Sequence, residues 1–206
     1  MKTHSILALV SMLTIGSASA ATGIFGSYAE IFTTSPTVYV AQSYGGSNPA
    51  FDGANFGTFT SSDTLTVSNA SVLTFKNSGA GENVTGSEIQ WRVFKNGDSP
   101  GSFATIGINF ESNSPNTDLG GQSFTGGDDQ EWRDLAAAAP DLIAAATAGN
   151  GDYTVEIFFR SDTSIGERFS NNGGSNYKAE FTLVPEPSIA LLGGLGLLGI
   201  LRRRRA

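Results

Sequence analysis

The sequence predicts an all-β protein: an antiparallel β-sandwich of jelly-roll or immunoglobulin-like type with a short helical insertion. Two observations support this fold class. Four stretches alternate apolar and polar residues with a period of two, which is typical of half-buried antiparallel strands. The 206-residue chain also contains 26 glycines, many of them in Asn-, Ser- and Gly-rich stretches that are typical of short loops. We expect this domain to cover residues 21–184.

Residues 1–20 have the features of a secretory signal peptide. Lys2 supplies a positive start, and an apolar stretch runs over residues 6–15. The small residues Ala18 and Ala20 flank Ser19, which is the pattern of a signal-peptidase site, so cleavage is expected after Ala20. The chain is therefore expected to leave the cytoplasm through the secretion translocon.

The strands are taken in chain order. Weak strand patterns occur at residues 37–42, 64–67 and 71–76. The first strong pattern covers residues 88–95, and the second covers 104–110. Residues 96–101, which include Asn96-Gly97, are expected to form the hairpin loop between them. The side chains predicted to face inward from these two strands are Ile89, Trp91, Val93, Ile106, Ile108 and Phe110.

A helical insertion is predicted next. Asp128 can cap a helix with Glu131 three residues later, and residues 132–138 are rich in helix formers. Pro140 would end this helix. Residues 141–148 are expected to form a second short helix that ends at Gly149.

Two more strong strands follow, at residues 153–160 and 177–183. Their alternation places Ile157 and Phe181 on the inward face, where we expect them to form the core with Trp91. The same alternation places Glu156 and Lys178 on the opposite face, in solvent.

Charge and composition exclude several classes of function. Residues 21–187 carry seven Lys and Arg against nineteen Asp and Glu, a net charge of −12, which disfavours nucleic acid as a partner because phosphate binding needs clustered cations. The chain has no cysteine, and its one histidine, His4, lies in the signal peptide. The exported domain therefore lacks the residues for Ser-His-Asp or Cys-His catalysis and for histidine-based metal sites.

Three classes of candidate site remain in the domain. Acids and amides cluster at residues 113–118, 126–129 and 150–152, and calcium prefers such oxygen ligands, although turns and helix caps use the same residues. We assign no metal site and no cofactor, with calcium as the one alternative left open. Outward-facing Phe94 and Phe158 could stack against a sugar, or could pack against the helical insertion through Trp132 and Leu135. Tyr39, Tyr44 and Trp132 are further sugar-contact candidates.

Paired carboxylates could hydrolyse glycosides without histidine. The acidic residues available for such a pair are Glu88, Glu111, Glu156 and Glu180. Because three of them lie where strand alternation points side chains into solvent, we assign no catalytic residue and expect no enzyme activity.

Residues 185–206 form a three-part tail. Pro185-Glu186-Pro187 is expected to stay extended, because proline fixes φ and lacks a donor. The apolar segment 189–201 would form a helix about 20 Å long, shorter than the roughly 30 Å hydrocarbon core of a membrane. Arg202, Arg203, Arg204 and Arg205 follow and would stay on the cytoplasmic side. A plain membrane anchor with a proline-containing stalk is the alternative interpretation.

In all three parts, the tail resembles the PEP-CTERM sorting signal of Gram-negative bacteria. This resemblance implies recognition and cleavage by an exosortase, a membrane transpeptidase with a cysteine nucleophile. It implies a protein held briefly in the inner membrane and then passed to the cell surface or the extracellular space. We therefore expect a non-enzymatic protein of the envelope or of an extracellular polysaccharide matrix such as a biofilm. The alternatives are a carbohydrate- or surface-binding module and, in third place, a glycoside hydrolase.

Overall fold

The structure is a computed structural model that describes residues 22–113, 116–124 and 126–186. Several residues of the expected targeting segments lie outside the described residues: Ala18 and Ala20 of the expected signal-peptidase site, Pro187, the segment 189–201 and the four arginines. Within those ranges, no helix is long and apolar enough to cross a membrane. The strands are β1 (Gly23–Phe32), β2 (Pro36–Gln42), β3 (Asn55–Phe59), β4 (Thr66–Phe75), β5 (Val84–Lys95), β6 (Ala104–Asn113), β7 (Asn116–Thr117), β8 (Ser123–Phe124), β9 (Asp129–Leu135), β10 (Gly151–Thr163), β11 (Gly166–Ser170) and β12 (Tyr177–Leu183).

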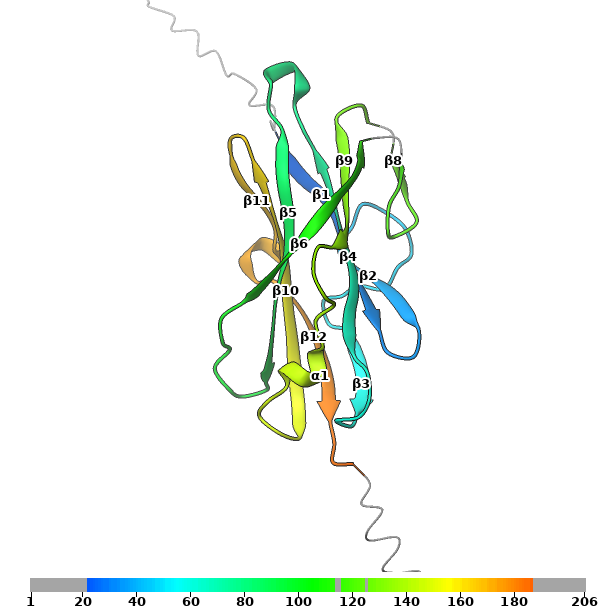
Figure 1. Cartoon of the computed structure of the whole chain (residues 1–206), viewed down its shortest axis with the longest axis vertical. Coiled ribbons are helices and arrows are strands. Elements are labelled where there is room, and N and C mark those ends of the chain that lie inside the picture. Colours follow the sequence, from blue (N-terminus) through cyan, green and yellow to red (C-terminus); the bar gives the residue numbers. More distant parts are fainter. Residues whose placement is uncertain (1–21, 114–115, 125, 187–206) are drawn as a thin grey trace, which may run out of the picture.

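The strands form one curled sheet, in the order β2-β1-β4-β9-β6-β5-β10-β12-β3, with β11 paired to β10 (Figure 1). All pairings along this path are antiparallel except that of β12 with β3, which is parallel. The two ends of the sheet approach each other, because Tyr39 of β2 and Phe56 of β3 pack edge to face with ring centroids 5.3 Å apart. β7 and β8 form a separate small sheet.

The four strongly alternating stretches are strands, and residues 37–42 also lie in a strand. Residues 64–67 and 71–76 belong in large part to one strand, β4. Gly97 has a positive φ in the connection between β5 and β6, as the predicted hairpin requires. The sequence patterns did not predict β1, β3 and β11. β1 lacks alternation because it is covered on both faces: Ala29 lies in the main core and Tyr28 in a second cluster with Leu73 and Phe124.

The predicted helix after Asp128 is wrong. Residues Asp129–Leu135 form β9, which pairs with β4 on one side and β6 on the other. Hydrogen bonding to two neighbouring strands outweighs the weak intrinsic helix preference of this segment. The second predicted helix is present only as one turn, α1 (Leu142–Ala145), capped by Asp141, whose side chain accepts a hydrogen bond from the Ala144 amide.

The core contains two of its three predicted central residues. Ile157 and Phe181 are buried, and the Phe181 ring stacks on Tyr153 with centroids 5.4 Å apart. Trp91 lies directly opposite Ile157 and packs against the same core, but it is only partly buried. Its neighbour on the other side is the small, exposed Ala104, which leaves one side of the indole uncovered.

β6 connects the two halves of the curled sheet. Its first half pairs with β5 through residues 104–108, and its second half pairs with β9 through residues 108–113. Figure 1 shows β6 running diagonally from β5 to β9. The sheet therefore has an open corner between the start of β5 and the end of β6, where the two strands are no longer hydrogen-bonded to each other.

Candidate functional site

A pocket of about 440 Å³ occupies this open corner, and we call it the corner pocket. One wall is the start of β5 (residues 83–85), and the others come from the end of β4, the second half of β6 and β9. The side chains that give it its chemistry are Lys76, Phe110, Asn113, Gln130 and Trp132.

Phe110 is not on the inward face, contrary to the strand alternation. Its side chain is 46% exposed, and its ring packs edge to face against Trp132 with centroids 5.3 Å apart. The reason is local: the register between β6 and β9 shifts on both sides of Phe110. Such irregularities re-aim side chains and are over-represented next to functional sites.

The polar wall of the pocket is a short chain of hydrogen bonds. The Lys76 ammonium and the Gln130 amide both donate to Asn113 Oδ1, each at 3.3 Å. Gln130 is only 4% exposed, and its Oε1 has no hydrogen-bond partner among the described residues. The Trp132 indole N–H is already used, because it donates to Thr74 Oγ1 at 3.3 Å. The wall therefore offers weakly engaged donors beside two aromatic rings, and it contains one buried, unpaired amide oxygen.

Two of the four candidate carboxylates, Glu156 and Glu88, are paired with arginines. Glu156 is buried rather than solvated, which corrects the sequence-based assignment of its face. It accepts hydrogen bonds from Arg92 at 2.9 and 2.7 Å and from Asn176 at 2.7 Å. Glu88 forms an ion pair with Arg160, with Nε and Oε1 2.9 Å apart. Glu111 and Glu180 are exposed.

Sequence reasoning missed a second buried carboxylate, Glu131 of β9, which is fully buried. Its Oε1 is 2.6 Å from an Arg133 nitrogen and also accepts from Ser71 Oγ at 3.2 Å. Burial raises the pKa of Glu131 above its ordinary value, although the Arg133 guanidinium opposes that shift. Burial and the nearby Asp118 carboxylate likewise raise the pKa of Tyr28. A glutamate that follows a predicted cap gave no signal of this burial.

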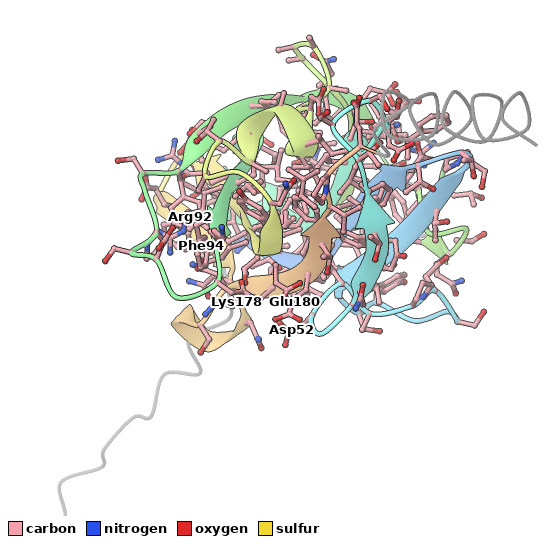
Figure 2. All side chains as sticks on the ribbon, turned by 90° about the horizontal axis from the view of Figure 1, so that it is seen from below. Asp52, Arg92, Phe94, Lys178 and Glu180 are labelled. Atoms are coloured by element: carbon pink, nitrogen blue, oxygen red, sulfur yellow. The ribbon has the colours of Figure 1, made fainter. Side chains whose placement is uncertain are left out.

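The outward aromatic residues of β5 and β10 pack against other partners than those expected. Phe158 packs edge to face against Phe103, with centroids 4.9 Å apart, and lies 6.3 Å from Phe169 of β11. The Arg92 guanidinium lies over the rings of Phe103 and Phe94. Figure 2 shows Arg92 and Phe94 on the same side of the molecule. Because β9 is a strand elsewhere in the sheet, Trp132 and Leu135 do not cover this face.

The other sugar-contact candidates are separate from one another. Tyr39 packs against the core through Phe51 and Phe56. Tyr44 is 42% exposed and packs edge to face against Phe25. Of the three, Trp132 alone lines the corner pocket.

Acids in the candidate calcium loops accept hydrogen bonds from their own turns or from a neighbouring strand. Asp118 Oδ1 accepts from the Gln122 amide, and Asp129 Oδ2 accepts from the Gly126 amide. Asp152 Oδ1 accepts from Thr182 Oγ1 at 2.7 Å. In the part of the chain that the structure describes, no three acidic or histidine side chains gather in a way that could hold a metal ion.

The predicted sorting motif begins where the last strand ends. The Val184 amide still donates to the Phe59 carbonyl oxygen of β3, and Pro185, which has no N–H, stops this pairing. Pro185 and Glu186 are exposed, and Glu186 Oε1 accepts from Ser61 Oγ at 2.7 Å. The motif therefore leaves the domain at its surface, beside the loop between β3 and β4.

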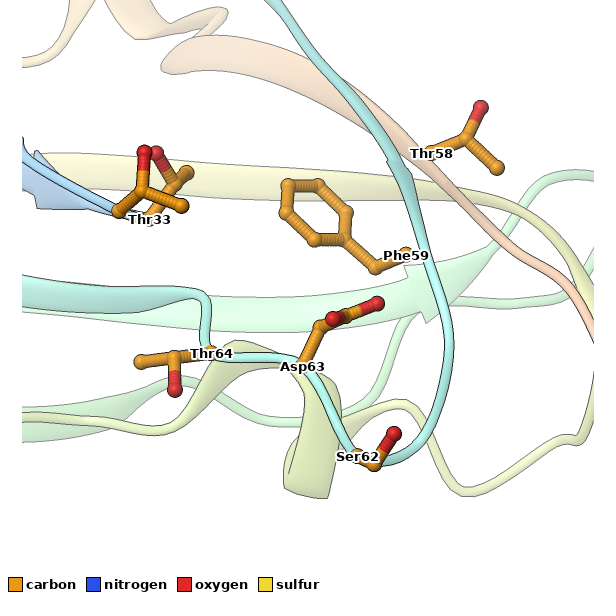
Figure 3. A pocket seen from close by; sticks show the side chains of 7 residues that line it. Thr33, Thr58, Phe59, Ser62, Asp63 and Thr64 are labelled. Atoms are coloured by element: carbon orange, nitrogen blue, oxygen red, sulfur yellow. The ribbon is translucent and has the colours of Figure 1, made fainter. Parts of the chain in front are cut away.

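A second pocket, of about 410 Å³, lies near the same loop. Figure 3 shows the Phe59 ring with Thr33 and Asp63 around it. Asp63 is committed to its own turn, because it accepts from the amide and the hydroxyl of Thr60, and these hydrogen bonds lower its pKa. The hydroxyl-rich wall presents no aromatic face as exposed as Phe110.

Comparison with known families identifies the tail. The model of the PEP-CTERM protein-sorting motif matches residues 183–205, so the chain carries this sorting motif. Its presence indicates an exported protein that an exosortase sorts to the cell surface. No curated protein and no solved structure matched the chain.

Proposed function

We propose that the folded domain is a non-enzymatic component of the cell envelope or of an extracellular polysaccharide matrix, delivered by exosortase cleavage of its tail. The observation that carries this proposal is the sorting motif at residues 183–205, which starts at the last residue of β12. Cleavage beyond Pro187 would leave all the described strands intact. The membrane would then hold the protein only until the tail is removed.

The mass of the intact protein recovered outside the cell tests delivery. We expect a protein without Leu201 and without Arg202 to Arg205. The double substitution Glu186→Ala and Pro187→Ala should leave the protein in the membrane fraction. The matched control is Ser61→Ala, which removes the partner of Glu186 in the folded domain but keeps the motif. Recovery of external protein with the arginines still attached would overturn the proposal.

The non-enzymatic part rests on the state of the candidate carboxylates. Glu156 and Glu88 each form an ion pair with an arginine, so neither carboxylate can approach a glycosidic oxygen without giving up that pair. Incubation of the exported protein with polysaccharides should release no new reducing ends. Release that Glu156→Gln or Glu131→Gln abolishes would instead favour a glycoside hydrolase.

The finer fold type belongs to the same proposal, which treats the curled sheet as a β-sandwich. Buried residues of β1 and β4 belong to the same core cluster as those of β5 and β10, as two packed layers require. An experimental structure in which these four strands surround an open interior would contradict this interpretation.

A further inference from the structure

The geometry of the corner pocket points to a binding site for one uncharged sugar unit of a saccharide chain. This inference deepens the proposed matrix role and rests on it for the source of the ligand. It depends on no residue of the tail, so the pocket and the delivery route can fail separately.

The aromatic surface is the first step. Phe110 is held out of the core by the two register shifts that flank it, and Trp132 supports its ring from the side. A Phe side chain that is 46% exposed leaves apolar surface in water. The apolar C–H face of a sugar ring would cover this surface, because carbohydrates combine apolar faces with polar edges.

The polar wall supplies the second step. Lys76 and Gln130 share one acceptor, Asn113 Oδ1, through hydrogen bonds at the long end of the normal range. Long, shared bonds are readily exchanged for bonds to a ligand. Gln130 is buried and its Oε1 lacks a partner among the described residues, which is a costly arrangement. A ligand hydroxyl relieves this cost once the Gln130 amide turns toward the pocket. Hydroxyl groups both donate and accept, so they match this mixture of ammonium and amide groups.

Charge decides between classes of saccharide. Of the described residues that line the pocket, only Lys76 is charged, whereas residues 21–187 carry a net charge of −12. A polyanionic saccharide would be attracted by one cation, Lys76, but repelled by the net negative charge of the protein. This repulsion would weaken its binding. An uncharged sugar avoids this repulsion and still uses Lys76 as a hydrogen-bond donor. The volume of about 440 Å³ lies within the range of small-molecule sites.

The chain allows a direct test, because it contains only two tryptophans, Trp91 and Trp132. The exported protein, labelled with ¹⁵N, is titrated with neutral tetrasaccharides of glucose, galactose, mannose and N-acetylglucosamine, and with tetragalacturonate as the acidic counterpart. At least one neutral tetrasaccharide should shift the Trp132 indole N–H signal saturably and leave the Trp91 signal in place. Its affinity should not change between about 50 and 500 mM salt.

Two exposed phenylalanines provide a matched pair of variants. Phe110→Ala should weaken binding about tenfold because the exposed half of the ring no longer meets the ligand. Phe169→Ala, at a ring that is 47% exposed on β11, should leave the affinity unchanged. Lys76→Met tests the polar wall independently if Phe110→Ala folds poorly, and it should also weaken binding.

Three results would overturn the inference. In the first, none of the neutral tetrasaccharides shifts the Trp132 signal, while the protein is still cleaved and released; the pocket assignment then fails and the proposed delivery stands. In the second, tetragalacturonate binds more tightly than every neutral chain and loses affinity with salt. In the third, Phe169→Ala weakens binding as much as Phe110→Ala, so the loss of affinity would not be specific to the corner pocket.

Discussion

Glu156 and Lys178 show how a single residue can depart from the pattern of its strand. The two lie directly opposite each other on β10 and β12, and alternation points both away from the core. Lys178 is exposed, but Glu156 is buried beneath Arg92 and Asn176. The outer face of β10 is therefore not a simple solvent face, because a side chain can be buried there by its polar neighbours.

Substitution should destabilise the protein at Glu156 and have little effect at Lys178. Glu156→Ala removes three hydrogen bonds to a buried carboxylate and leaves Arg92 without its carboxylate partner, which should cost roughly 1.5–3 kcal/mol of unfolding free energy. Lys178→Ala should change it by less than about 0.5 kcal/mol. Denaturant titration measures both. Equal and small effects would restore the solvent-facing interpretation of Glu156.

Glu131 makes stability depend on pH. Burial raises its pKa in the folded protein, so the folded state binds this proton more tightly than the unfolded chain does. Its contribution is therefore favourable at low pH, and it is lost as the pH rises from the ordinary glutamate value through the folded pKa. Arg133 and Asp118 act on the same carboxylate in opposite directions.

The difference in unfolding free energy between the parent protein and Glu131→Gln isolates this effect. Between about pH 4 and pH 8, the parent should lose stability relative to the variant as the pH rises. Glu111→Gln, at an exposed carboxylate, serves as the control and should show no such trend. A difference that grows in favour of the parent with rising pH would mean that Arg133 dominates and lowers the pKa of Glu131.

At the scale of elements, β9 is a strand although its local sequence favours a helix. Its residues pair with Val72 and its neighbours in β4 and with Phe110 and its neighbours in β6. Amide hydrogen exchange should therefore be slow at Trp132 and Glu131 and fast at Ala137 to Ala139, which lie outside any strand or helix and are exposed. Slow exchange across residues 132–138, with helical Cα shifts, would instead support the helix that local sequence favours.

The strands that could be predicted are those with one face in the core and one nearer solvent. Burial alternates along residues 177–183 as the sequence does. Residues 153–157 are all buried, yet their sequence still alternates because the outer side chains, Thr154 and Glu156, are polar. β1 and β4 could not be recognised as clearly, because the β7–β8 segment covers their outer face through Tyr28, Leu73 and Phe124. β9 was misassigned because its environment is supplied by strands distant in the chain.

The candidate site was predictable only in part, for the same reason. Trp132 could be named as a sugar contact from its residue type alone. Phe110 was assigned to the core, because the register shifts beside it depend on how β6 leaves β5 for β9. Lys76, Asn113 and Gln130 come from three different strands or strand ends. No spacing in the sequence indicates that they share a pocket.

At the scale of the whole molecule, the folded domain and the sorting tail are nearly independent. After Leu183, the Val184 N–H donates a hydrogen bond to the Phe59 carbonyl oxygen, and Glu186 accepts an exposed hydrogen bond from Ser61. The chain has no cysteine, so no disulfide links the domain to the tail or strengthens the domain. The stability of the domain must therefore come from its own core.

Two truncations that differ by four residues test this independence. A chain that stops after Val184 keeps β12 complete and loses only an exposed hydrogen bond, so its unfolding free energy should match that of the protein with the tail to within about 0.5 kcal/mol. A chain that stops after Glu180 loses Phe181 and Leu183, both buried, together with the stacking of Phe181 on Tyr153. Loss of the Phe181 side chain alone should cost roughly 3–5 kcal/mol, a large share of the stability of a domain of this size. Thermal melts of both truncated proteins, with and without reductant, provide the measurement, and reductant should have no effect on either. If the chain that stops after Val184 also melts far below the protein with the tail, then the tail is part of the fold. Cleavage by an exosortase would in that case release a destabilised domain.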